Sequence, residues 1–124
     1  IACLCDIRIA SQDAMFSMPE VTIGMIPGAG GTQTLPRTIG TGRAMSQFLA
    51  DRENRMTADE ALATGLVHRV VQNRELQITV MEIVQRLLDC EHEVLTAIKT
   101  AVVDGLDMAV ESGLSLERRL TAGR

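Results

Sequence analysis

The chain has 124 residues, of which 46% are apolar and 23% are charged, and its net charge is −4. This length is one domain's worth and buries roughly two-thirds of the surface of the unfolded chain. Two Phe, no Tyr and no Trp provide no stacking platform, and the acidic balance provides no basic footprint, so the composition excludes a nucleic-acid partner. No apolar run has the length of a bilayer span, and we therefore expect no membrane partner.

The first part of the chain reads as short extended segments joined by turns. Residues 1–10 open inside an apolar run and are predicted as the last turn of a buried helix that leads into a strand. Residues 15–18 are predicted as a second extended piece. Residues 20–26, rich in β-branched and apolar side chains, are predicted as a third. The glycine-rich turn at residues 27–31 then breaks the pattern.

Short helices and one more strand are expected next. Thr41 is a plausible N-cap for the second helix, and Thr57 with Glu60 has the spacing of a capping box for the third, which Gly65 stops. The expected elements are helices over residues 32–40, 41–51 and 57–65 and a strand over residues 66–71. Because strands alternate with helices in this part, the fold class is predicted to be α/β.

The chain after residue 72 is predicted to be wholly helical. Three amphipathic helices are expected, over residues 74–90, 91–107 and 108–124, with Gly105 closing the second. This change divides the chain into residues 1–72 and residues 73–124.

The glycine-rich turn raises a choice between a phosphate cradle and a close backbone approach. Gly28 and Gly30 supply two positions of a dinucleotide-binding fingerprint, but Gln33 stands where the third glycine belongs, and no Lys is present for a Walker loop. Anion binding by backbone N–H groups at the start of the helix near Thr32 stays open. A tight turn that lets backbone approach a ligand or another strand is favoured, because glycine permits both positive φ and close contact.

Glu20 is the strongest candidate for chemistry. A surface carboxylate at a strand edge is the simpler interpretation. The neighbours of Glu20 are nevertheless apolar: Met18, Pro19, Val21, Ile23, Met25 and Ile26. A carboxyl group among apolar side chains loses solvation, which raises its pKa and suits it to give as well as accept a proton near neutral pH.

The cysteines and histidines give weaker signals. Cys3 and Cys5 with His68 or His92 could be combined into a metal site, but the two cysteines lie in an apolar run, where a thiol is usually a small buried hydrophobe. No Cys-x-x-Cys pair is present, so we predict no metal. Cys90 makes the cysteine count odd and without framework spacing, which suits a reducing compartment. The spacing assembles no Ser-His-Asp arrangement.

A long stretch of the chain resembles the enoyl-CoA hydratase/isomerase family, the crotonases. The likeness covers nearly all of residues 2–118 and rests on three blocks. These blocks are CDIRIASQDAMFSMPEVTIGMIPGAGGTQTLPRTIGTGRAM at residues 5–45, TADEALATGLVHRVV at residues 57–71 and GLDMAVESGLSLE at residues 105–117.

The resemblance implies a spiral of repeated ββα units, of which residues 1–72 would be the C-terminal part, and a helical region, residues 73–124, that packs oligomers. It implies an acyl-CoA thioester as ligand and no cofactor, because coenzyme A is part of the substrate. Glu20 matches the glutamate that delivers a proton to the α-carbon. The residues implied to line the acyl pocket beside it are Pro19, Ile26, Pro27, Gly28, Ala29 and Gly30. A homotrimer or hexamer is implied, located in the cytoplasm, or in the mitochondrial matrix in a eukaryote.

The resemblance also implies more than one possible activity, and a single carboxylate does not decide between them. A hydratase would add water syn to a 2-enoyl-CoA, and an isomerase would use one glutamate to move a proton. A non-catalytic, truncated crotonase acting as an oligomerisation module is the competing interpretation.

The family's Gly-Gly-Gly-x-Glu segment supplies one oxyanion N–H and the other glutamate, and an earlier strand and loop supply the second oxyanion N–H. Neither segment has a counterpart in these residues. We therefore expect a fragment of a longer protein. Losing two oxyanion donors, at about 3 kcal/mol each, is expected to leave the 124-residue chain alone inactive or nearly so.

Overall fold

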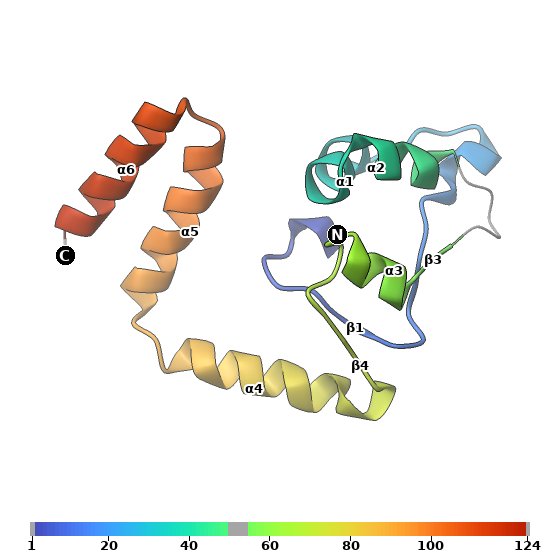
Figure 1. Ribbon diagram of the computed structural model, residues 1–124, viewed down its shortest axis with the longest axis horizontal. Coiled ribbons are helices and arrows are strands. Elements are labelled where there is room, and N and C mark those ends of the chain that lie inside the picture. Colours follow the sequence, from blue (N-terminus) through green and yellow to red (C-terminus); the bar gives the residue numbers. More distant parts are fainter. Residues whose placement is uncertain (1, 50–54, 124) are drawn as a thin grey trace. The chain divides into compact units, whose positions relative to one another are not determined.

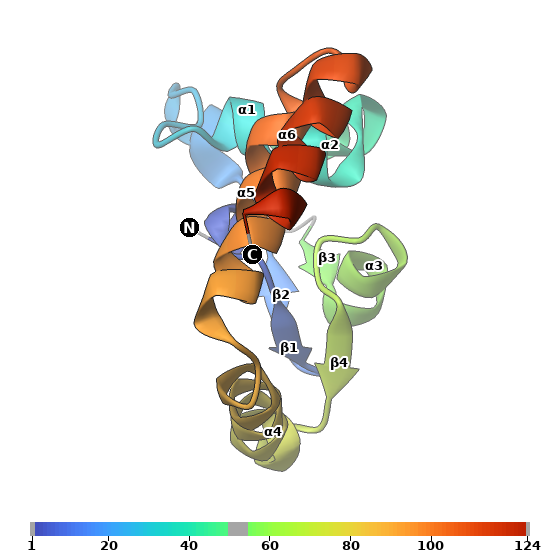
Figure 2. The ribbon, with the colours of Figure 1, turned by 90° about the vertical axis from the view of Figure 1, so that its left-hand side faces the viewer.

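The computed structural model describes residues 2–49 and 55–123, and the chain forms two compact units (Figures 1 and 2). The first unit comprises residues 1–80 and the second residues 81–124, with the boundary inside a long helix. The last described strand ends at Val71 and only helices follow it. The observed fold is thus α/β, as the sequence predicts, with short strands and a helical end.

In the described part of the first unit, four short strands form two two-stranded sheets. Strand β1 (Ile9–Ser11) runs parallel to β4 (Arg69–Val71), and β2 (Met15–Phe16) runs antiparallel to β3 (Met56–Thr57). The 3₁₀ turn η1 (Ala2–Leu4) precedes β1, so the predicted order of helical turn and strand is confirmed. The turn is not buried, however, because Leu4 is 67% exposed.

The strand predicted over residues 20–26 is wrong, because this segment forms the 3₁₀-helix η2 (Pro19–Ile23). Pro19 stands in the first turn, where its fixed φ favours a helix and its missing N–H costs no bond. The Thr22 hydroxyl donates to the Pro19 carbonyl at 2.8 Å, and Gly24, at φ 72°, ends the helix in the left-handed conformation. These backbone signals override the strand preference of the β-branched side chains.

Three short helices complete the first unit before β4. They are α1 (Gly31–Ile39), α2 (Thr41–Phe48) and α3 (Ala58–Ala63). The helix predicted over residues 32–40 is confirmed as α1, but the disturbance expected at Pro36 is absent, because α1 continues through this residue to Ile39. The predicted N-cap at Thr41 is wrong, because Gly40 precedes the helix at φ 84°, a conformation that favours glycine, and Thr41 is already helical. Residues 50–51 of the predicted second helix lie outside the described residues.

The capping box of α3 is confirmed. The Thr57 hydroxyl accepts from the Glu60 N–H, and the Glu60 carboxylate accepts from the Thr57 N–H at 2.7 Å. Gly65, at φ 78°, follows this helix as predicted. The sequence locates these features correctly because both depend on residues within one turn of the helix end.

The core of the first unit is built from small and aliphatic side chains of β1, β3 and the helices. Its buried residues are Ala10, Leu35, Ile39, Ala44, Met56, Ala58, Ala61, Leu66 and Val67. Alanine at four of these positions lets the short helices approach closely, which suits a chain with almost no aromatic residues.

Helices η3 (Asn73–Glu75), α4 (Leu76–Leu88), α5 (His92–Leu106) and α6 (Val110–Ala122) follow. The three long helices match the prediction. Gly105 does not stop α5, which continues to Leu106. Instead Gly105 lies against Gly113 of α6, so that a Cβ on Gly113 would stand 3.2 Å from the Gly105 carbonyl oxygen. The two helices of this hairpin therefore cross where neither carries a side chain.

Candidate active site

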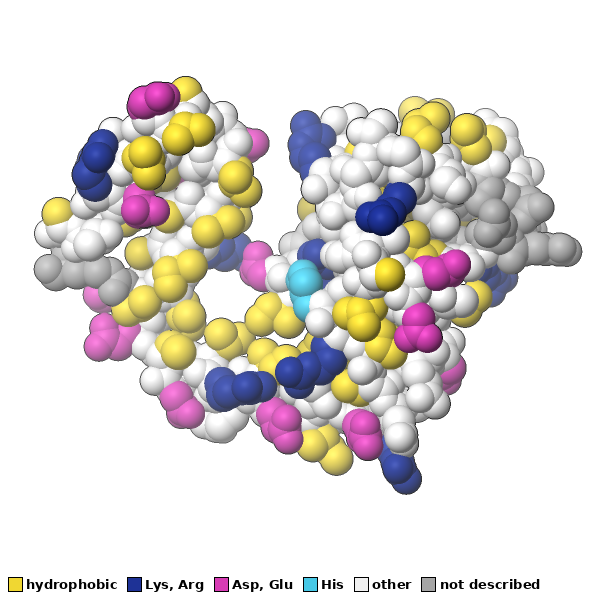
Figure 3. All heavy atoms as spheres, viewed as in Figure 1, with side chains coloured by type: hydrophobic (Ala, Val, Ile, Leu, Met, Phe, Trp, Pro, Cys, Tyr) yellow, Lys and Arg dark blue, Asp and Glu magenta, His cyan; other side chains and the backbone are white. Residues whose placement is uncertain are grey.

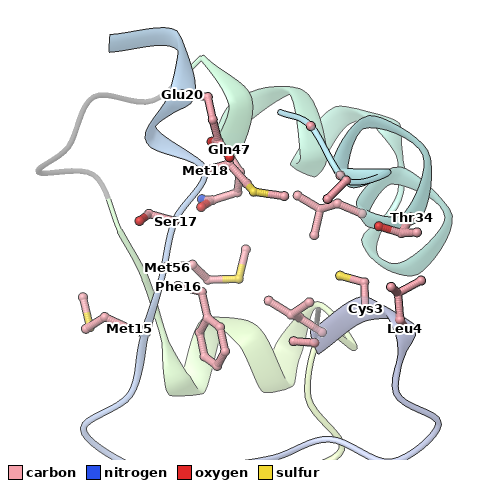
Figure 4. A pocket seen from close by; sticks show the side chains of 16 residues that line it. Cys3, Leu4, Met15, Phe16, Ser17, Met18, Glu20, Thr34, Gln47 and Met56 are labelled. Atoms are coloured by element: carbon pink, nitrogen blue, oxygen red, sulfur yellow. The ribbon is translucent and has the colours of Figure 1, made fainter. Parts of the chain in front are cut away.

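A hollow of about 460 Å³ opens in the first unit between η1, β2, η2, α1 and α2 (Figure 4). Its volume lies within the range of about 300–1,000 Å³ that ligand pockets occupy. Among the described residues that line it, Glu20 is the single charged one. The apolar lining residues with large side chains are Cys3, Leu4, Met15, Phe16, Met18, Leu35, Met56 and Leu66.

Glu20 has the surroundings of a functional carboxyl group. It is half-buried, and its Oε2 atom is fully buried without a hydrogen-bond partner among the described residues. A buried carboxyl oxygen normally finds a donor, because leaving it unpaired costs about 1–3 kcal/mol or more. The Glu20 Oε2 atom is therefore left to accept a hydrogen bond from a group outside the described residues.

The turn beside Glu20 has a backbone that side chains rarely adopt. The Gly31 N–H donates to the Gly28 carbonyl at 3.0 Å, and the two residues between them have positive φ, 49° at Ala29 and 79° at Gly30. This is the pattern of a type I′ turn. Left-handed backbone at Ala29 costs roughly 1–2 kcal/mol. Such strain persists mostly where function needs a fixed backbone, and both Gly28 and Ala29 line the pocket.

The same turn argues against a phosphate cradle. At the start of α1, the N–H groups of Gln33 and Thr34 donate to the Gly30 carbonyl, and that of Gly31 donates to Gly28. These three N–H groups are used inside the turn and are not available to an anion. The turn instead presents Gly28 and Ala29 to the hollow that holds Glu20.

The predicted site residues divide into two groups. Glu20, Gly28 and Ala29 line the hollow. Pro19, Pro27, Gly30 and Ile26 do not, and Ile26 is 81% exposed. Their contact with a substrate stays a prediction.

Other lining residues were missed by the sequence reasoning. Met18 stands two residues before Glu20 and could have been found by that position. Met56 and Gln47 reach the hollow only through tertiary folding, and no local signal marks them.

The cysteines and histidines build no metal site in the described part of the chain, where no cluster of three potential ligands occurs. The expectation of buried thiols is wrong for Cys5, which is exposed, while Cys3 is half-buried. His68 has a structural contact, since its Nδ1 accepts the Arg8 backbone N–H at 3.0 Å. This bond links His68, which precedes β4, to Arg8, which precedes β1.

Known proteins match this chain along nearly its whole length. A model of the enoyl-CoA hydratase/isomerase family matches residues 1–123. A short-chain-enoyl-CoA hydratase of Clostridium acetobutylicum is 41% identical over 117 residues, which are 94% of this chain and 44% of that protein. A crotonyl-CoA hydratase of Syntrophomonas wolfei is 39% identical over 117 residues, with the same two shares.

Solved structures give the same match. The crystal structure of an enoyl-CoA hydratase from Bacillus anthracis superposes with a TM-score of 0.91 at 36% identity, over 98% of this chain and 46% of that one. A structure from Geobacillus kaustophilus gives a TM-score of 0.89 at 38% identity. This chain thus spans less than half the length of the relatives it matches. Within residues 2–49 and 55–123, the helices are too short or too polar to cross a membrane.

Proposed function

The chain belongs to the enoyl-CoA hydratase/isomerase family, and from this premise we propose that it carries the Glu20 half-site of an enoyl-CoA hydratase. In this proposal the whole protein adds water syn across the 2,3 double bond of an acyl-CoA thioester. The relatives named short-chain-enoyl-CoA hydratase and crotonyl-CoA hydratase support a short unsaturated acyl group as substrate.

One observation carries the proposal. Within the described residues, the Oε2 atom of Glu20 is buried without a hydrogen-bond partner, and the hollow beside it is lined by no other charged side chain. An alkenyl chain needs apolar walls, and its α-carbon needs one nearby acid. The strained turn at Gly28 and Ala29 supports the same site, because backbone without bulky side chains allows a thioester and a water molecule to come close to that acid.

The proposed reaction divides one water molecule between two carbons. The water oxygen bonds to C3, the double bond becomes a single bond, and the Glu20 carboxyl group gives its proton to C2. The second carboxylate, which the family resemblance implies, takes the proton that leaves the water. Its return to Glu20 restores the starting protonation of the site. Coenzyme A stays attached throughout, so we propose that no metal or separate cofactor takes part.

Replacement of the acid tests this proposal. In the protein as its source makes it, Glu20→Gln should lower kcat for crotonyl-CoA hydration about 10²–10⁴-fold, because the amide keeps the shape but gives no proton. Glu82→Gln, at an exposed position of α4, is the matched control and should keep full activity. Equal activity of Glu20→Gln and the control would refute the proposal.

The same assay separates the alternatives. Conversion of a 3-enoyl-CoA to its 2-enoyl isomer without hydration would identify an isomerase, and acyl-CoA turnover absent from the native protein would favour the oligomerisation module. The 124 residues on their own hold no counterpart of the Gly-Gly-Gly-x-Glu segment. Robust hydration by them alone would contradict the expectation that they are inactive.

We also propose that residues 73–124 make contacts between copies of the protein, in a trimer or hexamer. Support comes from large apolar side chains that α5 and α6 leave exposed (Figure 3): Ile98, Val102, Val103, Leu106, Val110 and Leu114. A group of large, exposed apolar side chains on neighbouring helices is unusual on a monomer and marks an interaction site. A sedimentation mass equal to one chain at all concentrations would oppose this proposal. The cytoplasmic or mitochondrial compartment stays a prediction.

A further inference from the structure

We propose that Met18 limits the length of the acyl chain that fits beside Glu20. The inference rests on the proposed hydratase function and deepens it, because it assigns substrate selection to one side chain. Met18 lies two residues before Glu20, lines the same hollow, and stands near Glu20 in Figure 4.

Met18 is wedged against the glycine turn. A Cβ built on Gly31 would stand 2.8 Å from the terminal Cε of Met18 and 3.1 Å from the Cβ of Pro27. Gly31 is buried and begins α1. The thioether methyl therefore fills the space that a side chain at position 31 would occupy, and only glycine there lets Met18 lie back against the turn.

The rest of the apolar wall continues away from Glu20. Figure 4 shows Met56 and Phe16 beyond Met18, and these two residues pair across β2 and β3. Met56 is 6% exposed and belongs to the core, so its position is fixed by the fold. Met18 instead lies outside the described strands and helices, as the N-cap residue of η2, with no side-chain cap bond.

These contacts single out Met18 as the adjustable part of the wall. A methionine side chain is unbranched and flexible, so it fills an irregular space without a unique conformation. A hydrocarbon chain extending from the carbon beside Glu20 meets the methyl of Met18 before it reaches Phe16. We infer that the length of this side chain, and how far it lies back over Gly31, determine how many methylene groups the hollow accepts.

Two substitutions should move the specificity in opposite directions. Met18→Ala should raise the ratio of kcat/KM for 2-octenoyl-CoA to that for crotonyl-CoA by about tenfold or more, since methylene groups then find space in the wall. Gly31→Ala should lower the same ratio, because its methyl displaces the Met18 Cε from the turn while Pro27 leaves no room on the other side.

The double variant and two controls make the test decisive. Met18→Ala combined with Gly31→Ala should give a ratio above the native one but below that of Met18→Ala alone, because no thioether is left to displace and the methyl of the alanine at position 31 refills part of the space. Met18→Leu keeps an apolar side chain of similar volume and should stay within about threefold of the native ratio. Met45→Ala, at an exposed position of α2 outside the hollow, should leave the ratio unchanged.

The outcomes separate this inference from the proposed function. A native protein that hydrates neither substrate overturns the hydratase proposal itself. A native protein that hydrates crotonyl-CoA, with a ratio that none of the Met18 and Gly31 variants changes, overturns only the role of Met18. If Met18→Ala fails to fold, Gly31→Ala still decides, and an unchanged or higher ratio in that variant contradicts the inference.

Discussion

The two units of this chain differ in how far their apolar side chains are buried. Among its described residues, the first unit has nine buried apolar residues in and between its short helices and strands. Among residues 81–123 of the second unit no residue is buried. Yet α5 is among the more apolar helices of the chain, and Leu106 at its end is 82% exposed.

This difference in burial distinguishes the pocket around Glu20 from the exposed apolar surface of α5 and α6. Met18 packs against a core that the first unit supplies itself, and Glu20 and Gly28 line the same hollow as Met18. The apolar face of α5 and α6 contributes little to the stability of the second unit, because burial is what makes apolar area stabilising. We expect mutations in the first unit to change the free energy of unfolding, and mutations in the second unit to change self-association.

The largest effect is expected from a matched pair of isoleucines. Ile39 is 4% exposed in α1, and Ile98 is 57% exposed in α5. Ile39→Ala should lower the free energy of unfolding by about 2–5 kcal/mol, through lost burial and the cavity that remains. Ile98→Ala should change the free energy of unfolding of the monomer by about 0.5 kcal/mol or less, as surface substitutions do.

Urea denaturation at low protein concentration measures both values, and sedimentation measures association. Ile98→Ala should weaken self-association while Ile39→Ala does so only through unfolding. Equal losses of monomer stability for the two variants would show that the second unit has a core of its own, and the comparison would then fail.

The sequence predicts local features of both units well and nonlocal ones poorly. The capping box at Thr57 and Glu60 was predictable because its partners lie three residues apart. Glu20 was found from the apolar residues next to it in sequence, although of these Met18 lines the hollow while Ile23 and Ile26 are exposed. The strand predicted over residues 20–26 failed, since Pro19 and Gly24 determine the backbone there and side-chain preference does not. Gln47 and Met56 in the pocket required the fold itself.

The capping box gives the next prediction, since Glu91 and Ala109, the N-cap residues of α5 and α6, make no side-chain cap bond. Thr57→Ala should lower the stability of the first unit by about 1 kcal/mol. Ala109→Ser should stabilise the second unit by a similar amount, because Ala109 has the extended backbone of an N-cap residue. A thermal melt followed by circular dichroism measures both changes. No gain from the serine would mean that α6 does not limit the stability of its unit.

The Thr57 effect should also depend on pH. Hydrogen bonds from the Thr57 backbone N–H and then from its hydroxyl lower the pKa of Glu60 from its ordinary value of 4.5. Because the folded-state pKa is depressed, this stabilisation is present above pH 4.5 and is lost as the pH falls through the lower folded value. The difference between the native protein and Thr57→Ala should therefore be smaller at about pH 3 than at about pH 7. A difference that grows on acidification would contradict the assigned bonds.

The smallest expected effect distinguishes two helical glycines. A Cβ on Gly42 of α2 meets no atom within 4 Å, whereas a Cβ on Gly113 of α6 meets the Gly105 carbonyl oxygen at 3.2 Å. Gly42→Ala should therefore stabilise the protein by about 0.5–1 kcal/mol, because alanine is the better helix former. Gly113→Ala gains the same propensity but must separate the backbones of α5 and α6. We expect this separation to cancel the gain or reverse it, because the obstructing atom belongs to a helix and not to a flexible side chain. Equal stabilisation by both alanines would mean that α5 and α6 can move apart at no cost in free energy. The contact between these two helices would then contribute little to the stability of the second unit.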